Sequence, residues 1–278
     1  MITFTFDIQR MKDKVVVITG SSSGIGKALA ERFGEAGSKI LITGRNKQGL
    51  DVTVDELRKR NIVIHGFQGD VSIEQDNKSM AEEAVRLFGT IDILINNAGI
   101  SMRALFSEVD IEVVKKVMDI NFYGALYATK YCLPEIAKNQ GSIVGISSIA
   151  GFLGLPGRTG YSSSKFALNG FLAVMRTELL NTGVHVLTAC PGFTASNIRK
   201  HALTKDGHEQ GESPRAEEKM MSAEECACHI YKAVVKRKRT LVLTDQGKLA
   251  VWLNKWWPSM AERLVYYLMA KEKNAPMK

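Results

Sequence analysis

The sequence of 278 residues lacks the marks of a secreted or membrane-spanning protein. It has no run of about 18 uncharged apolar residues, so no strong transmembrane candidate is present. It has four cysteines without a paired framework, which argues against a disulfide scaffold and favours a reduced, cytoplasmic compartment. Asp7 and Arg10 interrupt the apolar pattern near the start, so we expect no secretory signal peptide.

The sequence also lacks the ligand spacing of a metal site. Cys226, Cys228 and His229 lie close together, but they fall in a helical stretch with no second ligand cluster. His201 and His208 lie in a long polar segment and are interpreted as solvated loop residues. We therefore predict no bound metal.

The excess of positive over negative charge is confined to one end of the chain. The formal net charge is +8, and residues 231–278 contain eleven Lys or Arg against three acidic residues, whereas residues 1–230 contain 26 of each sign. A basic patch is one feature of nucleic-acid binding, but the interleaved recognition features of such proteins are missing. We predict that nucleic acid is not a partner.

Seven short apolar runs alternate with longer helical patterns. The runs are rich in β-branched residues and cover residues 14–20, 39–44, 62–70, 91–99, 141–148, 184–192 and 240–245. Strands that are apolar throughout are covered on both faces, which indicates a parallel sheet between helix layers. We predict an α/β fold, a Rossmann-type doubly wound parallel sheet with helices on both faces.

No linker rich in Pro, Gly or Ser divides the chain before about residue 245. We therefore predict one catalytic domain over residues 1–246, with a substrate loop at about 193–222. Residues 247–278 are predicted to form a C-terminal helical appendage that is basic and rich in aromatic residues.

The segment GSSSGIG follows the first apolar run and precedes a helix expected from Lys27. In such a segment Gly20 allows a tight turn, Gly24 lets the backbone approach a pyrophosphate, and Gly26 lets helix and strand pack closely. Backbone N–H groups at a helix N-terminus favour phosphate binding. The predicted dinucleotide-binding residues here are Gly20, Ser21, Ser22, Ser23, Gly24, Ile25 and Gly26.

The end of the second apolar run indicates which dinucleotide is bound. An NAD site usually has an Asp or Glu at this point, whereas KILITGRN has Gly44 followed by Arg45. No carboxylate is present to repel a 2′-phosphate, and a guanidinium can bind one bidentately. This favours NADP(H), with Arg45 as the main discriminator and the serines of residues 21–23 as candidate hydroxyl partners.

The stretch YSSSK places Tyr161 and Lys165 one turn apart on a helix face. The ordinary pKa of tyrosine is about 10, too high for ready proton exchange at pH 7. A neighbouring ammonium favours the phenolate, so Tyr161 is a candidate general acid for carbonyl reduction and base for the reverse reaction. Taken alone, such a pair is better explained as a solvated helix end with an exposed lysine, and only the rest of the chain favours the catalytic interpretation.

Three motifs together resemble the short-chain dehydrogenase/reductase family over about residues 12–245. They are T-G-x-x-x-G-x-G at 19–26, NNAG at 96–99 and YSSSK at 161–165. The resemblance implies a catalytic set of Asn121, Ser148, Tyr161 and Lys165. In that set the Ser148 hydroxyl bonds the substrate oxygen, and Asn121 holds a water that links Lys165 to solvent.

The resemblance also implies further cofactor contacts. Residues 70–71 would line the adenine pocket, 97–99 would back the ribose, and the segment ACPGF would turn toward the nicotinamide. Positions 194 and 196 depart mildly from the family, which usually has Ile or Val and then Thr. The implied residues are Asp70, Val71, Asn97, Ala98, Gly99, Tyr161, Lys165, Pro191, Gly192, Thr194 and Ser196.

The activity that the resemblance implies is hydride transfer between NADP(H) and a carbonyl or secondary alcohol. The alternatives are a soluble reductase of 3-oxoacyl groups or small ketones, and a non-catalytic protein that senses NADP(H). Family members often form homodimers or homotetramers, here through helices around residues 105–135 and 161–181.

The tail has apolar residues at helical spacing. Pro258 breaks the pattern, and Ser259 with Glu262 predicts a capping box for a second helix. Apolar faces beside basic residues suggest a hydrophobic substrate, such as a steroid, retinoid or long-chain lipid, and a peripheral membrane contact. Packing on the core or on a partner subunit is the equal alternative. The residues at helical spacing in the first part are Leu249, Trp252, Leu253 and Trp256.

Overall fold

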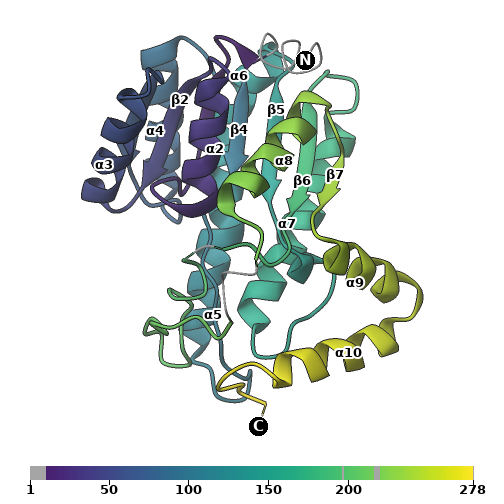
Figure 1. Ribbon diagram of the computed structural model, residues 1–278. Coiled ribbons are helices and arrows are strands. Elements are labelled where there is room, and N and C mark those ends of the chain that lie inside the picture. Colours follow the sequence, from purple (N-terminus) through teal and green to yellow (C-terminus); the bar gives the residue numbers. More distant parts are fainter. Residues whose placement is uncertain (1–10, 196, 216–219, 278) are drawn as a thin grey trace.

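The computed structural model describes residues 11–195, 197–215 and 220–277. Within them, a parallel sheet of seven strands has the order β3-β2-β1-β4-β5-β6-β7 (Figure 1). This confirms the predicted doubly wound fold, and each strand lies inside one of the seven apolar runs. The strands are β1 (Val15–Ile18), β2 (Lys39–Gly44), β3 (Ile64–Gln68), β4 (Ile93–Asn96), β5 (Ser142–Ile146), β6 (His185–Cys190) and β7 (Thr240–Val242).

Helices cover both faces of the sheet, as the uniformly apolar strands require. Val16 and Ile18 of β1 pack into one hydrophobic cluster, while Val17 packs into the other, because successive side chains of a strand point to opposite faces. Burial of each such side chain contributes about 1.5–3 kcal/mol. The first cluster includes α2 (Gly24–Glu35), α3 (Lys47–Arg58) and α8 (Ala223–Val235), and the second includes α4 (Glu74–Phe88), α6 (Gly124–Lys138) and α7 (Thr159–Glu178).

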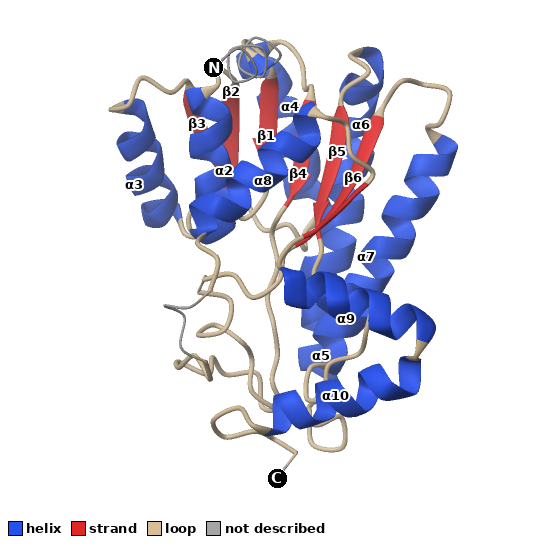
Figure 2. Cartoon of the chain, turned by 45° about the vertical axis from the view of Figure 1, so that its right-hand side comes forward, coloured by secondary structure: helices blue, strands red, loops and turns tan. Residues whose placement is uncertain are grey.

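The strand order places β1 between β2 and β4. Strands β2 and β3 lie on one side of β1, and the chain then crosses back to form β4 on its other side. In such sheets ligands bind at the carboxyl ends of the strands, beside this switch point. The elements beyond that end are α5 (Ile111–Met118), the π-helical turn η1 (Asp119–Tyr123), the 3₁₀ turn η2 (Ile149–Gly151) and the long loop before α8 (Figure 2).

The C-terminal segment forms two helices, α9 (Asp245–Trp256) and α10 (Pro258–Ala270), at the same end of the molecule (Figure 2). The predicted capping box is wrong, because α10 begins at Pro258 and Ser259 lies inside the helix. Proline suits the first helical position, since its fixed φ is already helical and its missing N–H is not needed there. Among the described helices, none is both long and apolar enough to cross a membrane.

Candidate active site

A cavity of about 1500 Å³ opens at the carboxyl ends of the strands. This volume exceeds the roughly 300–1,000 Å³ of typical small-ligand pockets. The loops after β1, β2 and β4 line one half of the cavity. The segments after β5 and β6, together with α9 and α10, line the other half. The cavity therefore has room for a dinucleotide and a second molecule.

The glycine-rich loop after β1 brings backbone to the cavity wall. Gly20 has φ +62° and a Cβ there would lie 2.6 Å from the Cα of Ala98, so glycine is required. Helix α2 begins at Gly24, three residues earlier than expected, and the side chain of its N-cap residue Ser23 makes no capping hydrogen bond. Ser22, Ser23, Gly24 and Ile25 line the cavity. This cradle at a helix N-terminus fits a pyrophosphate.

Two residues predicted to bind the cofactor do not line the cavity. Ser21 is buried, where its hydroxyl donates to Ile18 O at 2.6 Å and accepts from Thr43 N at 3.1 Å. Gly26 lies against Asn97, because a Cβ on it would be 2.5 Å from the Asn97 Nδ2 atom. Ser21 therefore joins β1 to β2, and Gly26 permits close helix packing.

Arg45 lines the cavity where β2 ends. Its Nη1 lies 3.8 Å from Asp70 Oδ2, and its side chain is 59% exposed. Asp70 Oδ1 also accepts from Ser72 N at 2.9 Å, so the Asp70 carboxylate is held in place. Asp70 and Val71 line the same part of the cavity.

Residues 97–99, which follow β4, also line the cavity. The Asn97 amide donates to Thr19 O at 3.0 Å and to Gly20 O at 2.8 Å. Asn97 therefore fixes the glycine-rich loop against the end of β4. Ala98 packs against Gly20, so this segment supports the cradle as well as lining it.

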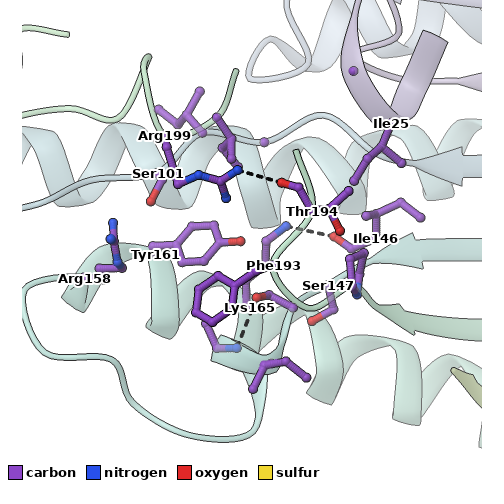
Figure 3. A pocket seen from close by; sticks show the side chains of 18 of the residues that line it. Ile25, Ser101, Ile146, Ser147, Arg158, Tyr161, Lys165, Phe193, Thr194 and Arg199 are labelled. Carbon is purple, nitrogen blue, oxygen red and sulfur yellow. Dashed lines mark hydrogen bonds between the residues drawn. The ribbon is translucent and has the colours of Figure 1, made fainter. Parts of the chain in front are cut away.

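Ser148, Tyr161 and Lys165 line the same cavity. Figure 3 shows Tyr161 and Lys165 there. Tyr161 and Lys165 project from α7, and Ser148 is the N-cap of η2. Lys165 is buried, its Nζ donates to Ile146 O at 2.9 Å, and it lies 5.7 Å from the centre of the Tyr161 ring. Burial lowers the pKa of Lys165 to about 8.

Burial raises the pKa of Tyr161 above its ordinary value. The Ser148 hydroxyl and the positive charges of Arg158 and Arg199 oppose this rise, so all three lie near the phenol. We predicted Lys165 as the neighbouring cation and missed the two arginines. Arg158 stands three residues before Tyr161, so its closeness to the phenol could have been predicted from the sequence. Arg199 lies in the polar loop, where no sequence pattern indicates a contact with Tyr161.

Asn121 lies in the π-helical turn η1, a feature that is frequent at functional sites. Its Oδ1 accepts from Ile100 N at 2.8 Å, and its Nδ2 donates to Ile100 O and to Ser164 Oγ, both at 2.9 Å. Asn121 does not line the cavity. Its side chain ties the segment after β4 to α7 beside Lys165, and its role in a water relay stays a prediction.

The segment after β6 closes the cavity from another side. Pro191, Gly192 and Thr194 line it, and Ser196 lies outside the described residues. A Cβ on Gly192 would clash with Thr244 Oγ1, the N-cap group of α9. Thr194 O accepts from Arg199 Nη2 at 2.7 Å. This segment therefore sets the position of both α9 and Arg199.

The C-terminal helices form an apolar wall of the second half of the cavity. The wall is fixed at its far end by Glu272, which is buried and forms ion pairs with Arg215 at 2.6 Å and with Arg158 at 3.2 Å. Asn254 Nδ2 also donates to Phe152 O at 2.8 Å. The appendage therefore packs on the core through one face. The apolar residues of the wall are Leu249, Ala250, Leu253, Leu264, Val265 and Leu268.

The sequence of this chain is similar to that of known oxidoreductases. A family model described as short chain dehydrogenase matches residues 14–207. Dehydrogenase/reductase SDR family member 7B of Mus musculus is 34% identical over 95% of this chain and 84% of its own length. Dehydrogenase/reductase SDR family protein 7-like of Drosophila melanogaster is 31% identical over 94% of this chain and 81% of its own length.

A solved structure shows the same fold. It is a short chain dehydrogenase/reductase from Burkholderia phymatum in complex with NAD, 24% identical, with a TM-score of 0.80 over 90% of this chain and 95% of that chain. From the family model, the relatives and the site, the chain belongs to the short-chain dehydrogenase/reductase family of oxidoreductases, which bind a nicotinamide dinucleotide.

Proposed function

We propose that the protein is an NADPH-dependent reductase that converts a ketone or other carbonyl to a secondary alcohol. The observation that carries this proposal is the grouping of Ser148, Tyr161 and Lys165 beside a dinucleotide-sized cavity. A protein that only sensed NADP(H) would have no need of a proton donor in this place. The bound nicotinamide would supply the hydride.

The residues of this chain would bind the carbonyl oxygen and supply its proton. The Ser148 hydroxyl would hold the carbonyl oxygen next to the Tyr161 hydroxyl, and Tyr161 would donate its proton to that oxygen. The ammonium of Lys165, fixed by Ile146 O, would stabilise the negative charge that develops on the phenol. Gly20, Ser22, Ser23 and the first turn of α2 would hold the pyrophosphate.

The substrate is proposed to be hydrophobic, of the size of a steroid, retinoid or long-chain lipid. Support comes from α9 and α10, whose leucines line the same cavity as Tyr161. A soluble 3-oxoacyl group or small ketone would leave most of that apolar wall uncovered. The alternative therefore predicts that chain length has little effect on turnover.

NADPH oxidation by the purified full chain across a carbonyl panel tests this proposal. The panel runs from small ketones to steroid and long-chain keto-lipids. We expect kcat/KM to rise with apolar area, by about tenfold for each 1.4 kcal/mol of added transition-state binding. Equal rates across the panel would support the small-ketone alternative, and tight NADPH binding without turnover would support a sensor.

We predict a pH dependence that originates from Lys165. Below its pKa of about 8 the ammonium is charged and favours the developing phenolate, so reduction is fast. As the pH rises through about 8 the charge is lost, the phenol becomes a weaker acid, and kcat/KM for reduction falls. A Lys165→Met variant should be slow at all pH values and lack this step. A step near pH 8 that persists in the variant would contradict this assignment.

We also propose that α9 and α10 contact an anionic membrane surface. Several aromatic side chains of α9, of α10 and of the residue between them are at least half exposed, including Trp252, Trp256, Trp257 and Tyr267. Basic residues flank them, and Lys255 lies 5.2 Å from the centre of the Trp256 ring. Aromatic residues with interspersed cations are typical of segments that lie in the interface of anionic lipids.

Tryptophan fluorescence tests the membrane contact directly, because all three tryptophans of the chain lie in this segment. Vesicles containing phosphatidylserine should shift the emission to shorter wavelength, and high salt should reverse the shift by screening. The double variant Lys248→Gln/Lys255→Gln should bind about tenfold or more weakly, at about 1 kcal/mol per basic residue. Neutral phosphatidylcholine vesicles are the control, and an unshifted spectrum with the anionic vesicles would overturn the proposal.

We further propose a homo-oligomer formed through α7. Phe166 and Val174 are exposed on one face of this helix, and Gly170 between them has open space in front of it. Light scattering on the wild type and on Val174→Glu tests this interface. A monomeric wild type would contradict it.

A further inference from the structure

Tyr161 lies in the first turn of α7, so the residues that begin this helix set the position of its hydroxyl. Arg158 is the N-cap residue of α7, and Tyr161 follows three residues later. The carbonyl oxygen of Arg158 accepts from Ser162 N at 2.8 Å, which closes the first turn around Tyr161. A contact that holds Arg158 therefore also holds the helical turn that carries the proposed proton donor.

Residues 271–277, which follow α10, pack against the start of α7. Glu272 Oε2 pairs with Arg158 Nη2 at 3.2 Å, although 114 positions separate the two residues in the sequence. A Cβ on Gly157 would lie 2.7 Å from Pro276 Cγ, so the same segment also covers the residue before Arg158. An ion pair and a packing contact therefore connect the C-terminal segment to the helix that carries Tyr161.

The ion pair between Arg158 and Glu272 is buried on both sides, at 7% and 5% exposure. Water screens an exposed ion pair, whereas breaking a buried one leaves a charge without compensation. Arg158 Nη1 also donates to Met102 O at 3.4 Å. Glu272 pairs in addition with Arg215 at 2.6 Å and with Arg103 at 3.5 Å. Both the guanidinium and the carboxylate are therefore fixed in place.

The fixed guanidinium of Arg158 acts on the Tyr161 phenol. Figure 3 shows Arg158 on one side of the Tyr161 ring. Burial raises the pKa of Tyr161, and the Ser148 hydroxyl and then the charge of Arg158 oppose this rise. Glu272 supports this effect, because it supplies the negative charge that keeps a buried guanidinium at this place. The other charged or titratable groups near the phenol are Lys165 of α7, Arg199 of the loop before α8, and Cys190 at the end of β6.

We propose that Glu272 is a positioning residue of the reaction, which holds Arg158 and the first turn of α7 so that Tyr161 is set as the proton donor. This inference rests on the proposed reductase function and extends its machinery to the segment after α10. Glu272 acts through Arg158 and takes no part in bond making. Without its carboxylate the Arg158 guanidinium would move toward water, because an unpaired buried charge is costly. The phenol would then be a weaker acid and a slower proton donor.

Fluorine NMR tests the proposal without any need for turnover. The full chain is prepared with 3,5-difluorotyrosine, because ring fluorines make a phenol a stronger acid and bring its titration to a lower pH. The Tyr161 signal is the one that is missing in Tyr161→Phe. In Glu272→Gln its titration midpoint should rise by about one pH unit, the low end of the effect of a neighbouring charge. Glu272→Asp keeps the charge and should restore part of the wild-type midpoint. An unchanged midpoint in Glu272→Gln would overturn the proposal.

A double-mutant cycle tests whether Glu272 acts through Arg158. Arg158→Met alone should raise the Tyr161 midpoint by a similar amount, and Glu272→Gln should add less than about a third of its own effect in that background. A full further shift in the double variant would contradict the pathway through Arg158. Arg158→Met leaves Glu272 paired with Arg103 and Arg215, so it carries the test if Glu272→Gln does not fold. A wild-type midpoint in Arg158→Met would also overturn the proposal.

Glu212→Gln is the matched control for Glu272→Gln. Glu212 pairs with Lys273 of the same segment at 3.0 Å, but this pair is exposed and Glu212 does not line the cavity. Its removal should leave both the Tyr161 midpoint and turnover at their wild-type values, because an exposed pair contributes little. A shift equal to that of Glu272→Gln would assign the effect to general loosening of residues 271–277 and contradict the role of Glu272.

A turnover arm separates the positioning role from the reaction. In alcohol oxidation Tyr161 has to be the phenolate, so kcat/KM with NADP⁺ should rise with pH through its midpoint. In Glu272→Gln this profile should move to higher pH, and kcat for carbonyl reduction at pH 7 should fall roughly 3- to 10-fold while KM for NADPH stays within about twofold. If the fluorine midpoint moves but no carbonyl or alcohol reacts, the proposed reaction fails and the positioning role stands. Turnover that depends on Tyr161, with an unmoved midpoint in Glu272→Gln, would keep the reaction and overturn the positioning role.

Discussion

Replacing Tyr161 by Phe should lower kcat for carbonyl reduction by roughly 10²- to 10⁴-fold, the range of a general acid. The ring stays in place and only the hydroxyl is removed, so the cavity keeps its shape. Affinity for NADPH should change by less than about threefold, because the pyrophosphate cradle lies in the loop after β1. Turnover is followed by NADPH absorbance, and binding by NADPH fluorescence.

A control with the same chemical change is available on the surface. Tyr267 is 65% exposed on α10 and does not line the cavity, so Tyr267→Phe should retain full activity with soluble ketones. Retention of wild-type turnover in Tyr161→Phe would remove Tyr161 from the reaction. Loss of NADPH binding in that variant would instead indicate a damaged fold.

Reversing the charge of Arg45 should reverse the cofactor preference. Arg45→Glu would remove the proposed charge-assisted hydrogen bond to the 2′-phosphate and add repulsion, so the ratio of kcat/KM with NADPH to that with NADH should fall roughly 100- to 1,000-fold. Most of the change should appear in KM for NADPH. NADH kinetics should improve, since a carboxylate at this position can accept hydrogen bonds from the ribose.

Lys47→Glu is the matched control for Arg45. Lys47 is a cation two residues away that pairs with Asp51 and does not line the cavity. Its reversal should leave the NADPH to NADH ratio within about twofold, apart from the weak long-range field of an exposed charge. A wild-type enzyme that already prefers NADH would contradict the assigned role of Arg45.

Local sequence patterns were enough to predict the sheet. The seven runs, each β-branched and bounded by turn residues, correspond one by one to strands of a parallel sheet. The residues at which the strands end were less predictable, because Gly and Asn, such as Gly44 and Asn96, can either end a strand or begin a loop. The start of α2 was placed three residues late, since a glycine-rich segment gives no helical signal of its own.

The proposed catalytic residues Tyr161 and Lys165 could be named from the sequence because they have a fixed spacing within one motif. The arginines and Glu272 were not visible, because they come from separate loops and the far C-terminus and meet only in the folded chain. Ser21 illustrates the reverse case. Its place in the motif suggested a cofactor contact, but its hydroxyl is used to bridge β1 and β2.

The tail packs partly on the core and leaves several aromatic side chains exposed, and its membrane contact stays a prediction. Leu253 is buried and lines the cavity, whereas Trp252 and Trp256 are exposed on the same helix. Helical spacing predicted that an apolar face exists. The spacing could not predict which of these side chains are buried and which are exposed, because that depends on how α9 packs on η2.

The central claim is that hydride passes to a carbonyl carbon while Tyr161 supplies the proton. Its most direct test is reduction of a long-chain ketone with NADPH that carries deuterium at both hydrogen positions of the nicotinamide C4, followed by mass spectrometry of the alcohol. We predict one deuterium on the carbinol carbon in the wild type, and at least a hundredfold less labelled alcohol from Tyr161→Phe in the same time. Alcohol formed without deuterium, or labelled equally fast by Tyr161→Phe, would contradict the account.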